Sequence, residues 1–226
     1  MKNPEEIILK NKFYPEGIKE KETFNYYQKI RREIIKENNR RDIMILLFSK
    51  FNQPIFKRKE KNKYLNLNNS NYDKIFNGRT IGIYSIMKNY EDFGIIDIDI
   101  DNNFELAKST TLDVYEYLIR QNFDTIKDIE IRYTGKHSFH LIVKFKQKQR
   151  IGDIKNILRN ILNNKYLMNK YHMVYKRTKG IPNLDLSPNK YNGAYISKYS
   201  LSLWGLKCEE IQKNDLMKIR QEDFKI

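Results

Sequence analysis

The sequence has one cysteine, Cys208, in 226 residues. A disulfide framework and a zinc site built from several cysteines are therefore excluded. No apolar run approaches the length of a membrane span, and residues 1–20 carry too many charges for a secretory signal peptide. We expect a cytoplasmic globular protein, of a prokaryotic cell or a virus-infected host, with no membrane partner.

Acidic residues are also scarce. There are 28 of them against 43 Lys and Arg, which gives a formal net charge of +15 and a pI of about 9.6. Hydrophobic residues make up 40% and aromatic residues 13%, more than a disordered basic tail would carry. The chain is long enough to bury a core of its own, and its positive charge favours a polyanionic partner.

The charges are segregated along the chain. Residues 1–75 carry 18 basic and 10 acidic side chains, a balance of +8. Residues 76–126 carry 4 and 9, or −5, and residues 127–207 carry 17 and 4, or +13. The pattern suggests carboxylates that bind cations between surfaces that bind phosphates. The alternative is a solvated basic surface in a chain whose composition is biased towards Lys, Asn and Ile.

The hydrophobic pattern predicts helices and short strands in mixed order. Helical spacing covers residues 20–38, 104–119 and 151–163, and a short helix is expected near 209–219. Asn102 or Asn103 is the expected N-cap of the second helix. Strand patterns cover residues 43–49, 79–87, 93–99, 129–133, 139–145, 173–176, 183–186 and 194–203. Residues 57–78 predict loops around a hairpin.

This order favours an α+β fold, a two-layer sandwich with a mixed, largely antiparallel sheet flanked by helices. We expect a single domain over residues 1–226. Its portions would be an N-terminal helix and strand region (1–75), a core (76–207) and a C-terminal helix (208–226).

The most informative segment for chemistry is Gly94-Ile-Ile-Asp-Ile-Asp-Ile-Asp101. On a strand, Asp97, Asp99 and Asp101 share one face, which is an unfavourable arrangement of like charges unless a cation binds there. Mg²⁺ accepts such sparse carboxylate ligation when substrate phosphates complete its coordination. We predict that Asp97 and Asp99 bind metal and that Asp101 caps the next helix. A solvated strand face is the alternative.

A second candidate site is the segment Thr134-Gly-Lys-His-Ser-Phe-His140. Gly135 permits a tight turn, in which Thr134, Lys136 and backbone amides can donate hydrogen bonds to phosphate oxygens. His140 shares a strand face with Ser138, and its imidazole can donate to a triphosphate or transfer a proton. A structural or surface role for either histidine of the segment is the alternative.

The third candidate is Asp185, in Asn183-Leu-Asp185, which is almost alone as an acidic residue in a basic stretch. It either neutralises neighbouring cations or serves as a third metal ligand beside Asp97 and Asp99 on a neighbouring strand.

In this order, the three sites resemble the motifs of the archaeo-eukaryotic primase superfamily. The matching segments are IIDID at 95–99, TGKHSFH at 134–140 and LD at 184–185. The closest branch is that of the polymerase domains of end-joining DNA ligases. It is matched further by Tyr14-Pro15-Glu16-Gly17-Ile18, Tyr26-Tyr27, Asp185…Asn189 and Tyr199-Ser200-Leu201.

The resemblance implies a primase-polymerase core with an RRM-like sheet. Asp97, Asp99 and Asp185 would be catalytic and would hold two Mg²⁺ or Mn²⁺ ions, without zinc. Thr134, Lys136, Ser138, His140 and Lys198 would bind the NTP or dNTP. Template and primer DNA, with gapped or overhanging ends, would be tracked by basic residues including Lys19, Lys21, Arg40, Arg41 and Arg58. A separately encoded DNA ligase and an end-binding protein are the implied protein partners.

The sequence departs from this branch at four positions. Thr134 replaces Ser and Ser138 replaces the second Gly of the turn motif, and both are tolerable on size. Ser202 stands where the family has an arginine that contacts the incoming nucleotide, and Lys198 is the nearby cation that could replace it. Glu20 stands at the position of a lysine linked to 5′-phosphate recognition, although Lys19 and Lys21 flank it. The zinc knuckle of replicative primase small subunits is missing.

Three functions fit this sequence. The first is template-directed nucleotide addition to a 3′-hydroxyl in gap repair or end joining. The second is a replication primase of a plasmid, virus or small genome, and the third is a non-catalytic nucleic-acid-binding module. A histidine-directed nuclease fits less well, because the segment His137-Ser-Phe-His140 lacks the required spacing.

Overall fold

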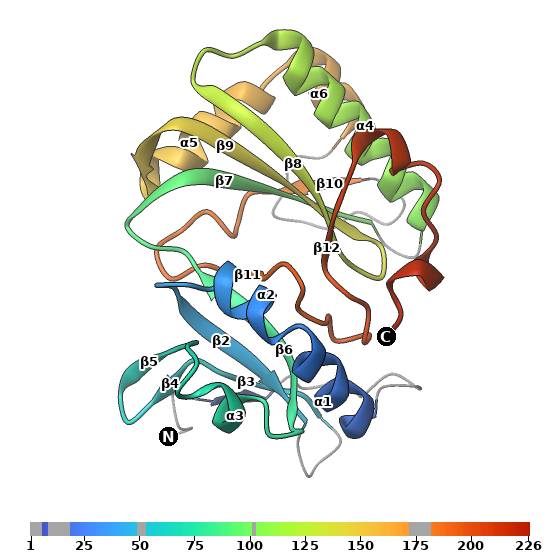
Figure 1. Ribbon diagram of the computed structural model, residues 1–226. Coiled ribbons are helices and arrows are strands. Elements are labelled where there is room, and N and C mark those ends of the chain that lie inside the picture. Colours follow the sequence, from blue (N-terminus) through green and yellow to red (C-terminus); the bar gives the residue numbers. More distant parts are fainter. Residues whose placement is uncertain (1–5, 9–18, 49–52, 101–102, 172–181) are drawn as a thin grey trace. The chain divides into compact units, whose positions relative to one another are not determined.

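A computed structural model describes residues 6–8, 19–48, 53–100, 103–171 and 182–226 (Figure 1). The chain divides into two compact units. The first unit comprises residues 1–86, 194–208 and 224–226, and the second unit comprises residues 87–193 and 209–223. Within the described residues, no helix is both long and apolar enough to cross a membrane.

The first unit contains a sheet built around β2. This strand pairs with β6 on one side and with β3 and β5 on the other, and β11 pairs with the far edge of β6. Each of these pairings is antiparallel. The strands are β1 (Glu6–Ile8), β2 (Asp42–Leu47), β3 (Ile55–Lys57), β4 (Lys59–Glu60), β5 (Lys63–Asn66), β6 (Thr80–Ile86) and β11 (Ala194–Ile196).

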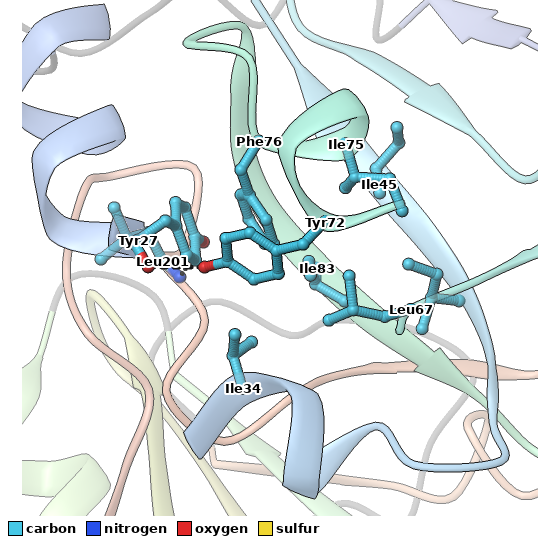
Figure 2. Close-up of a cluster of buried hydrophobic side chains, with 10 residues drawn as sticks. Tyr27, Ile34, Ile45, Leu67, Tyr72, Ile75, Phe76, Ile83 and Leu201 are labelled. Carbon is cyan, nitrogen blue, oxygen red and sulfur yellow. Dashed lines mark hydrogen bonds between the residues drawn. The ribbon is translucent and has the colours of Figure 1, made fainter. Parts of the chain in front are cut away.

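Three helices, α1 (Glu20–Lys29), α2 (Arg31–Glu37) and α3 (Tyr72–Ile75), contribute to the core of this unit. Figure 2 shows the rings of Tyr27, Tyr72 and Phe76 gathered together, and the Phe76 ring centroid lies 4.1 Å from that of Tyr27 and 4.5 Å from that of Tyr72. The buried Tyr27 hydroxyl donates to the Ile81 carbonyl and accepts from the Leu201 amide. The Tyr27 ring therefore fills part of the core, while its hydroxyl joins α1 to β6 and to the segment after β11.

A buried polar cluster, Asn38, Ser85 and Ser197, joins three distant parts of the sequence in the first unit. The Asn38 Oδ1 atom accepts hydrogen bonds from both serine hydroxyls, at 2.8 and 2.9 Å, and its Nδ2 donates to the Ile34 carbonyl. Since each polar group of this cluster is hydrogen-bonded, its burial is compatible with a stable core.

The second unit contains a five-stranded sheet in the order β10-β7-β9-β8-β12, with antiparallel pairing throughout. The strands are β7 (Tyr90–Asp99), β8 (Ile126–Gly135), β9 (Ser138–Arg150), β10 (Asn183–Asp185) and β12 (Glu209–Ile211). The helical elements are α4 (Phe104–Gln121), α5 (Ile151–Leu162), α6 (Lys165–Lys170) and the 3₁₀ turns η1 (Lys213–Asp215) and η2 (Gln221–Phe224).

Helices α4 and α5 cover one face of this sheet (Figure 1). The Phe104 ring of α4 lies 5.8 Å from the rings of Tyr133 and Phe139. A Cβ atom added to Gly94 would come within 2.8 Å of side chains of α5, so glycine lets this helix pack closely on β7. Because side chains alternate along a strand, the Asp97 side chain leaves the opposite face.

At the surface, Asp113 of α4 accepts three hydrogen bonds, from Tyr166 (3.0 Å), Lys170 (2.9 Å) and Tyr171 (2.5 Å). Partial burial acts to raise the pKa of the Asp113 carboxyl. The three hydrogen bonds outweigh it, and the pKa lies below its ordinary value. This cluster therefore ties α6 and the residue after it to α4.

The α+β class with antiparallel sheets is confirmed, and the N-cap is Asn103, whose side chain accepts from the Leu106 amide. Three expectations were wrong. The strand expected over residues 194–203 ends at Ile196. Residues 20–38 form two helices, because Ile30 leaves the helical conformation (φ −103°, ψ 21°). Residues 209–211 form β12 rather than a helix, because they pair with the exposed edge of β8. Asp101 and the strand expected at 173–176 lie outside the described residues.

Candidate active site

Polar side chains form a row across the second sheet, on the face opposite α4 and α5. In the antiparallel register, Asp185 of β10 lies opposite Asp97 of β7, Asp97 opposite His140 of β9, and His140 opposite Arg132 of β8. The side chains of directly paired residues project from the same face of a sheet, with their Cβ atoms about 4.5–5.5 Å apart. Three segments separated by about forty residues each in the sequence thus meet in one row.

A second polar row lies beside the first, two residues along each strand. Asp99 is paired with Asn183 on one side and with Ser138 on the other. Because the side-chain period of a strand is two, Asp99 leaves the same face as Asp97. The two rows together contain the three aspartates predicted from the sequence, with Ser138 and His140 beside them.

Asp97 is held by the neighbouring strand β9. Its Oδ1 atom accepts a 3.0 Å hydrogen bond from the Ser138 hydroxyl and lies 3.5 Å from Nε2 of His140. Burial, and then the positive charge of Arg132, lower the pKa of His140 to about 3. The imidazole is therefore neutral at physiological pH, and its contact with Asp97 is not an ion pair.

A buried ion pair that the sequence analysis missed stands next to His140. The Arg132 guanidinium donates to Glu130 Oε1 through Nε at 3.0 Å and through Nη2 at 2.6 Å, and both side chains are at least nine-tenths buried. The only sequence signal is the alternation of Glu130 and Arg132 in the strand pattern EIR. The Arg132 guanidinium lies opposite His140, and its positive charge adds to the effect of burial in lowering the pKa of His140.

Three side-chain atoms of the described residues are buried without a hydrogen-bond partner, and all three lie on this face. They are Oγ1 of Thr134, Nδ1 of His140 and Oδ1 of Asn183. Burying an unsatisfied polar atom costs about 1–3 kcal/mol, so proteins usually pair such atoms with a protein group, a water molecule or a ligand. Thr134 and His140 were predicted to bind a nucleotide, whereas the Asn183 side chain was not singled out.

No protein-family model matches the sequence, and no curated protein is similar to it. Solved structures do match. The polymerase domain of Mycobacterium tuberculosis Ligase D, solved in complex with DNA, superposes with a TM-score of 0.69 over 91% of this chain and 86% of that chain, at 11% identity.

The chain has the fold of that polymerase domain. At 11% identity, the likeness supports a shared fold but not a shared activity. Any conclusion about chemistry therefore depends on the residues of this chain.

Within this polymerase-domain fold, the aspartates suit a divalent cation in chemistry and in register. Carboxylate and amide oxygens are the ligands that Mg²⁺ and related cations prefer. The three carboxylates do not point to a common position in this structure. No group of three His, Cys, Asp or Glu residues in the described part of the chain is placed to hold a metal. The Asp185 oxygens instead accept from the Ser187 amide and hydroxyl, both at 2.7 Å.

Lys136, the remaining predicted residue of the second unit, is partly buried in the turn between β8 and β9, with φ +53°. The other predicted residues belong to the first unit. Lys19, Lys21 and Arg40 are exposed, while Arg41, Arg58 and Lys198 are partly buried. Lys19 forms an ion pair with Glu22, the Arg58 Nε–H points to Met44 Sδ at 3.2 Å, and Lys198 lies over the Tyr199 ring. Ser202, expected from the sequence resemblance to replace an arginine, is buried and accepts from the amides of Trp204 and Leu206. It closes a turn and bears no charge. The Tyr14–Ile18 motif lies outside the described residues.

Proposed function

We propose that this protein is a template-directed nucleotidyltransferase, a primase-polymerase that adds NTPs or dNTPs to a 3′-hydroxyl in gap repair or end joining. The observation that carries the proposal is the double row on β10, β7 and β9. It puts Asp97, Asp99 and Asp185 on one face beside Ser138 and His140, within the fold of a polymerase domain. A structural sheet face has no evident need for three neighbouring carboxylates.

The three carboxylates would hold two Mg²⁺ or Mn²⁺ ions, which supply Lewis-acid activation of the 3′-hydroxyl and neutralise the charge of the triphosphate. The protein's own groups have separate tasks. Ser138 holds the Asp97 carboxylate through its hydroxyl hydrogen bond. The neutral imidazole of His140 has one N–H group with which to donate to a phosphate oxygen, and Lys136 contributes a full positive charge.

The basic side chains of the first unit would contact the DNA backbone. Lys19, Lys21 and Arg40 are exposed and belong to a region of net charge +8. Phosphate contacts of this kind release counterions, so we expect DNA affinity to fall steeply with salt concentration.

Primer extension in Mn²⁺ with NTPs and with dNTPs tests the proposal, on gapped, overhanging and single-stranded templates. Asp97→Asn keeps the shape of the side chain and removes its charge, and we expect it to reduce incorporation by about a hundredfold or more. Asp153→Asn, an exposed position in the first turn of α5, is the matched control and should be silent. Incorporation that survives Asp97→Asn would overturn the assignment.

The same assay separates the other functions that fit the sequence. If the protein synthesises dinucleotides on a single-stranded template without a primer, its function is primer synthesis rather than gap filling. Tight DNA binding with no metal-dependent incorporation would overturn the catalytic proposal in favour of a binding module.

A further inference from the structure

The turn that joins β8 to β9 has an unusual backbone. The turn residues are Lys136 and His137, flanked by the pair Gly135 and Ser138. Gly135 has φ +114° and Lys136 has φ +53°, so a lysine stands in the left-handed region that favours glycine. Such a conformation costs of the order of 1 kcal/mol and persists only when neighbouring groups hold it.

Two side chains hold this turn through one carbonyl oxygen. The amide Nε2 of Gln221, in η2, donates to the Lys136 carbonyl, and the Tyr133 hydroxyl donates to the same oxygen at 3.2 Å. Nε2 of Gln221 also lies 3.2 Å from Nδ1 of His137. Gln221 therefore contacts both residues of the turn, although it lies about 85 residues further along the chain.

The segment that carries Gln221 is itself anchored to the second unit. It begins with β12, which pairs with β8, and it continues through the fully buried Leu216. The ammonium of Lys108, on α4, donates to the carbonyls of Met217 (3.2 Å) and Ile219 (3.1 Å). Lys108 is only 3% exposed and is paired with Glu105 at 2.8 Å. A buried lysine fastened to two backbone carbonyls fixes the chain two residues before Gln221.

We propose that Gln221 is a positioning residue for nucleotide binding. By holding the Lys136 carbonyl, it keeps Lys136 in its left-handed conformation and so presents the Lys136 ammonium and the neighbouring Thr134 to the triphosphate. This inference rests on the proposed function and extends it to a residue that no sequence pattern singled out. Gln221 touches no substrate itself and acts through the turn.

Three variants test the role of Gln221. Gln221→Ala removes the donor, and Gln221→Glu keeps the shape but puts a carboxylate, which has no N–H, against the Lys136 carbonyl. We expect both to raise the KM for the incoming nucleotide by about tenfold, the scale of one lost hydrogen bond, with kcat changed by less than about threefold. Gln147→Ala, an exposed glutamine at the far end of β9, is the matched control and should change neither.

A second measurement does not depend on activity. Hydrogen–deuterium exchange of the amides of residues 134–138 should quicken in Gln221→Ala and Gln221→Glu and stay unchanged in Gln147→Ala. Wild-type exchange in both Gln221 variants would overturn the inference. So would faster exchange with an unchanged nucleotide KM, or a Gln221→Glu variant that behaves as wild type, since either would reduce Gln221 to a structural role.

The two proposals fail in different ways. Loss of the inference alone would appear as unchanged KM values in an enzyme that still requires Asp97. If the wild-type protein incorporates no nucleotide, the proposed function is overturned and the role in nucleotide binding with it.

Discussion

Replacing Asn189 by alanine should lower the free energy of unfolding more than replacing an exposed polar side chain does. Asn189 is 1% exposed and follows β10 in a tight turn. Its Oδ1 accepts from the Ile95 amide at 2.8 Å, while its Nδ2 donates to the Ile95 carbonyl at 2.6 Å and to the Leu186 carbonyl at 3.2 Å. The side-chain amide thus pairs with β7 as the next residue of a strand would, and it extends the ladder formed by β10.

The magnitude follows from the groups left behind. Asn189→Ala strips the Ile95 amide and carbonyl of this buried partner, and each unsatisfied group costs about 1–3 kcal/mol. With partial relaxation we expect a loss of about 3 kcal/mol in the free energy of unfolding. For a chain of this size, that corresponds to a fall in Tm of about 6–12 °C. Asn189→Asp should cost at least as much, because a carboxylate can accept from the Ile95 amide but cannot donate to its carbonyl.

Urea unfolding followed by circular dichroism measures this loss, with Asn160→Ala as the control. Asn160 is exposed on α5, where alanine is the better helix former, so the control should be neutral or slightly stabilising. A loss below about 0.5 kcal/mol for Asn189→Ala would refute the view that the side chain completes the ladder.

Three further predictions concern other buried or paired groups. Asn38→Leu should cost about 1–3 kcal/mol in urea unfolding, because the Ser85 and Ser197 hydroxyls, which lie 2.8 Å apart, can then donate only one to the other, and one buried hydroxyl loses its acceptor; an unchanged midpoint would contradict this. Asp113 has a lowered pKa in the folded protein, so its stabilising effect is present above pH 4 and is lost as the pH falls below that value. Asp113→Asn should therefore unfold more easily at pH 7 and lose less stability between pH 4 and pH 2, and parallel curves for variant and wild type would refute the assignment. Asn183→Leu should leave the unfolding free energy within about 1 kcal/mol, since its carbonyl oxygen has no partner to lose, yet weaken Mn²⁺ binding in calorimetry; wild-type Mn²⁺ affinity would refute a role for that oxygen.

The sequence predicted those parts of the fold whose patterns are local. Helix α4 was found from its apolar spacing and its Asn103 cap, and β7 from the alternation around Asp97, because both signals lie within one element. The break at Ile30 was missed, since the apolar spacing continues through it and only the backbone departs from the helix. Strand β12 was missed because its conformation comes from pairing with β8, a tertiary effect.

The residues of the candidate site could be predicted where they belong to short sequence motifs. Asp97, Asp99, Ser138 and His140 were named from two segments, and the register shows these segments side by side. What the sequence could not supply is the partner of each group. The reach of Gln221 to the β8–β9 turn does not follow from local pattern, because it depends on how the chain returns to the sheet.

The division of the chain between the two units has a consequence for its synthesis. The first unit needs residues 194–208, which supply β11 and Leu201, to complete a sheet and a core begun before residue 87. When only the residues up to 86 have been synthesised, β6 has no β11 strand to pair with, and the hydrophobic core lacks Leu201. The first unit can therefore complete its sheet only after residues 194–208, more than a hundred residues further along the chain, have been made.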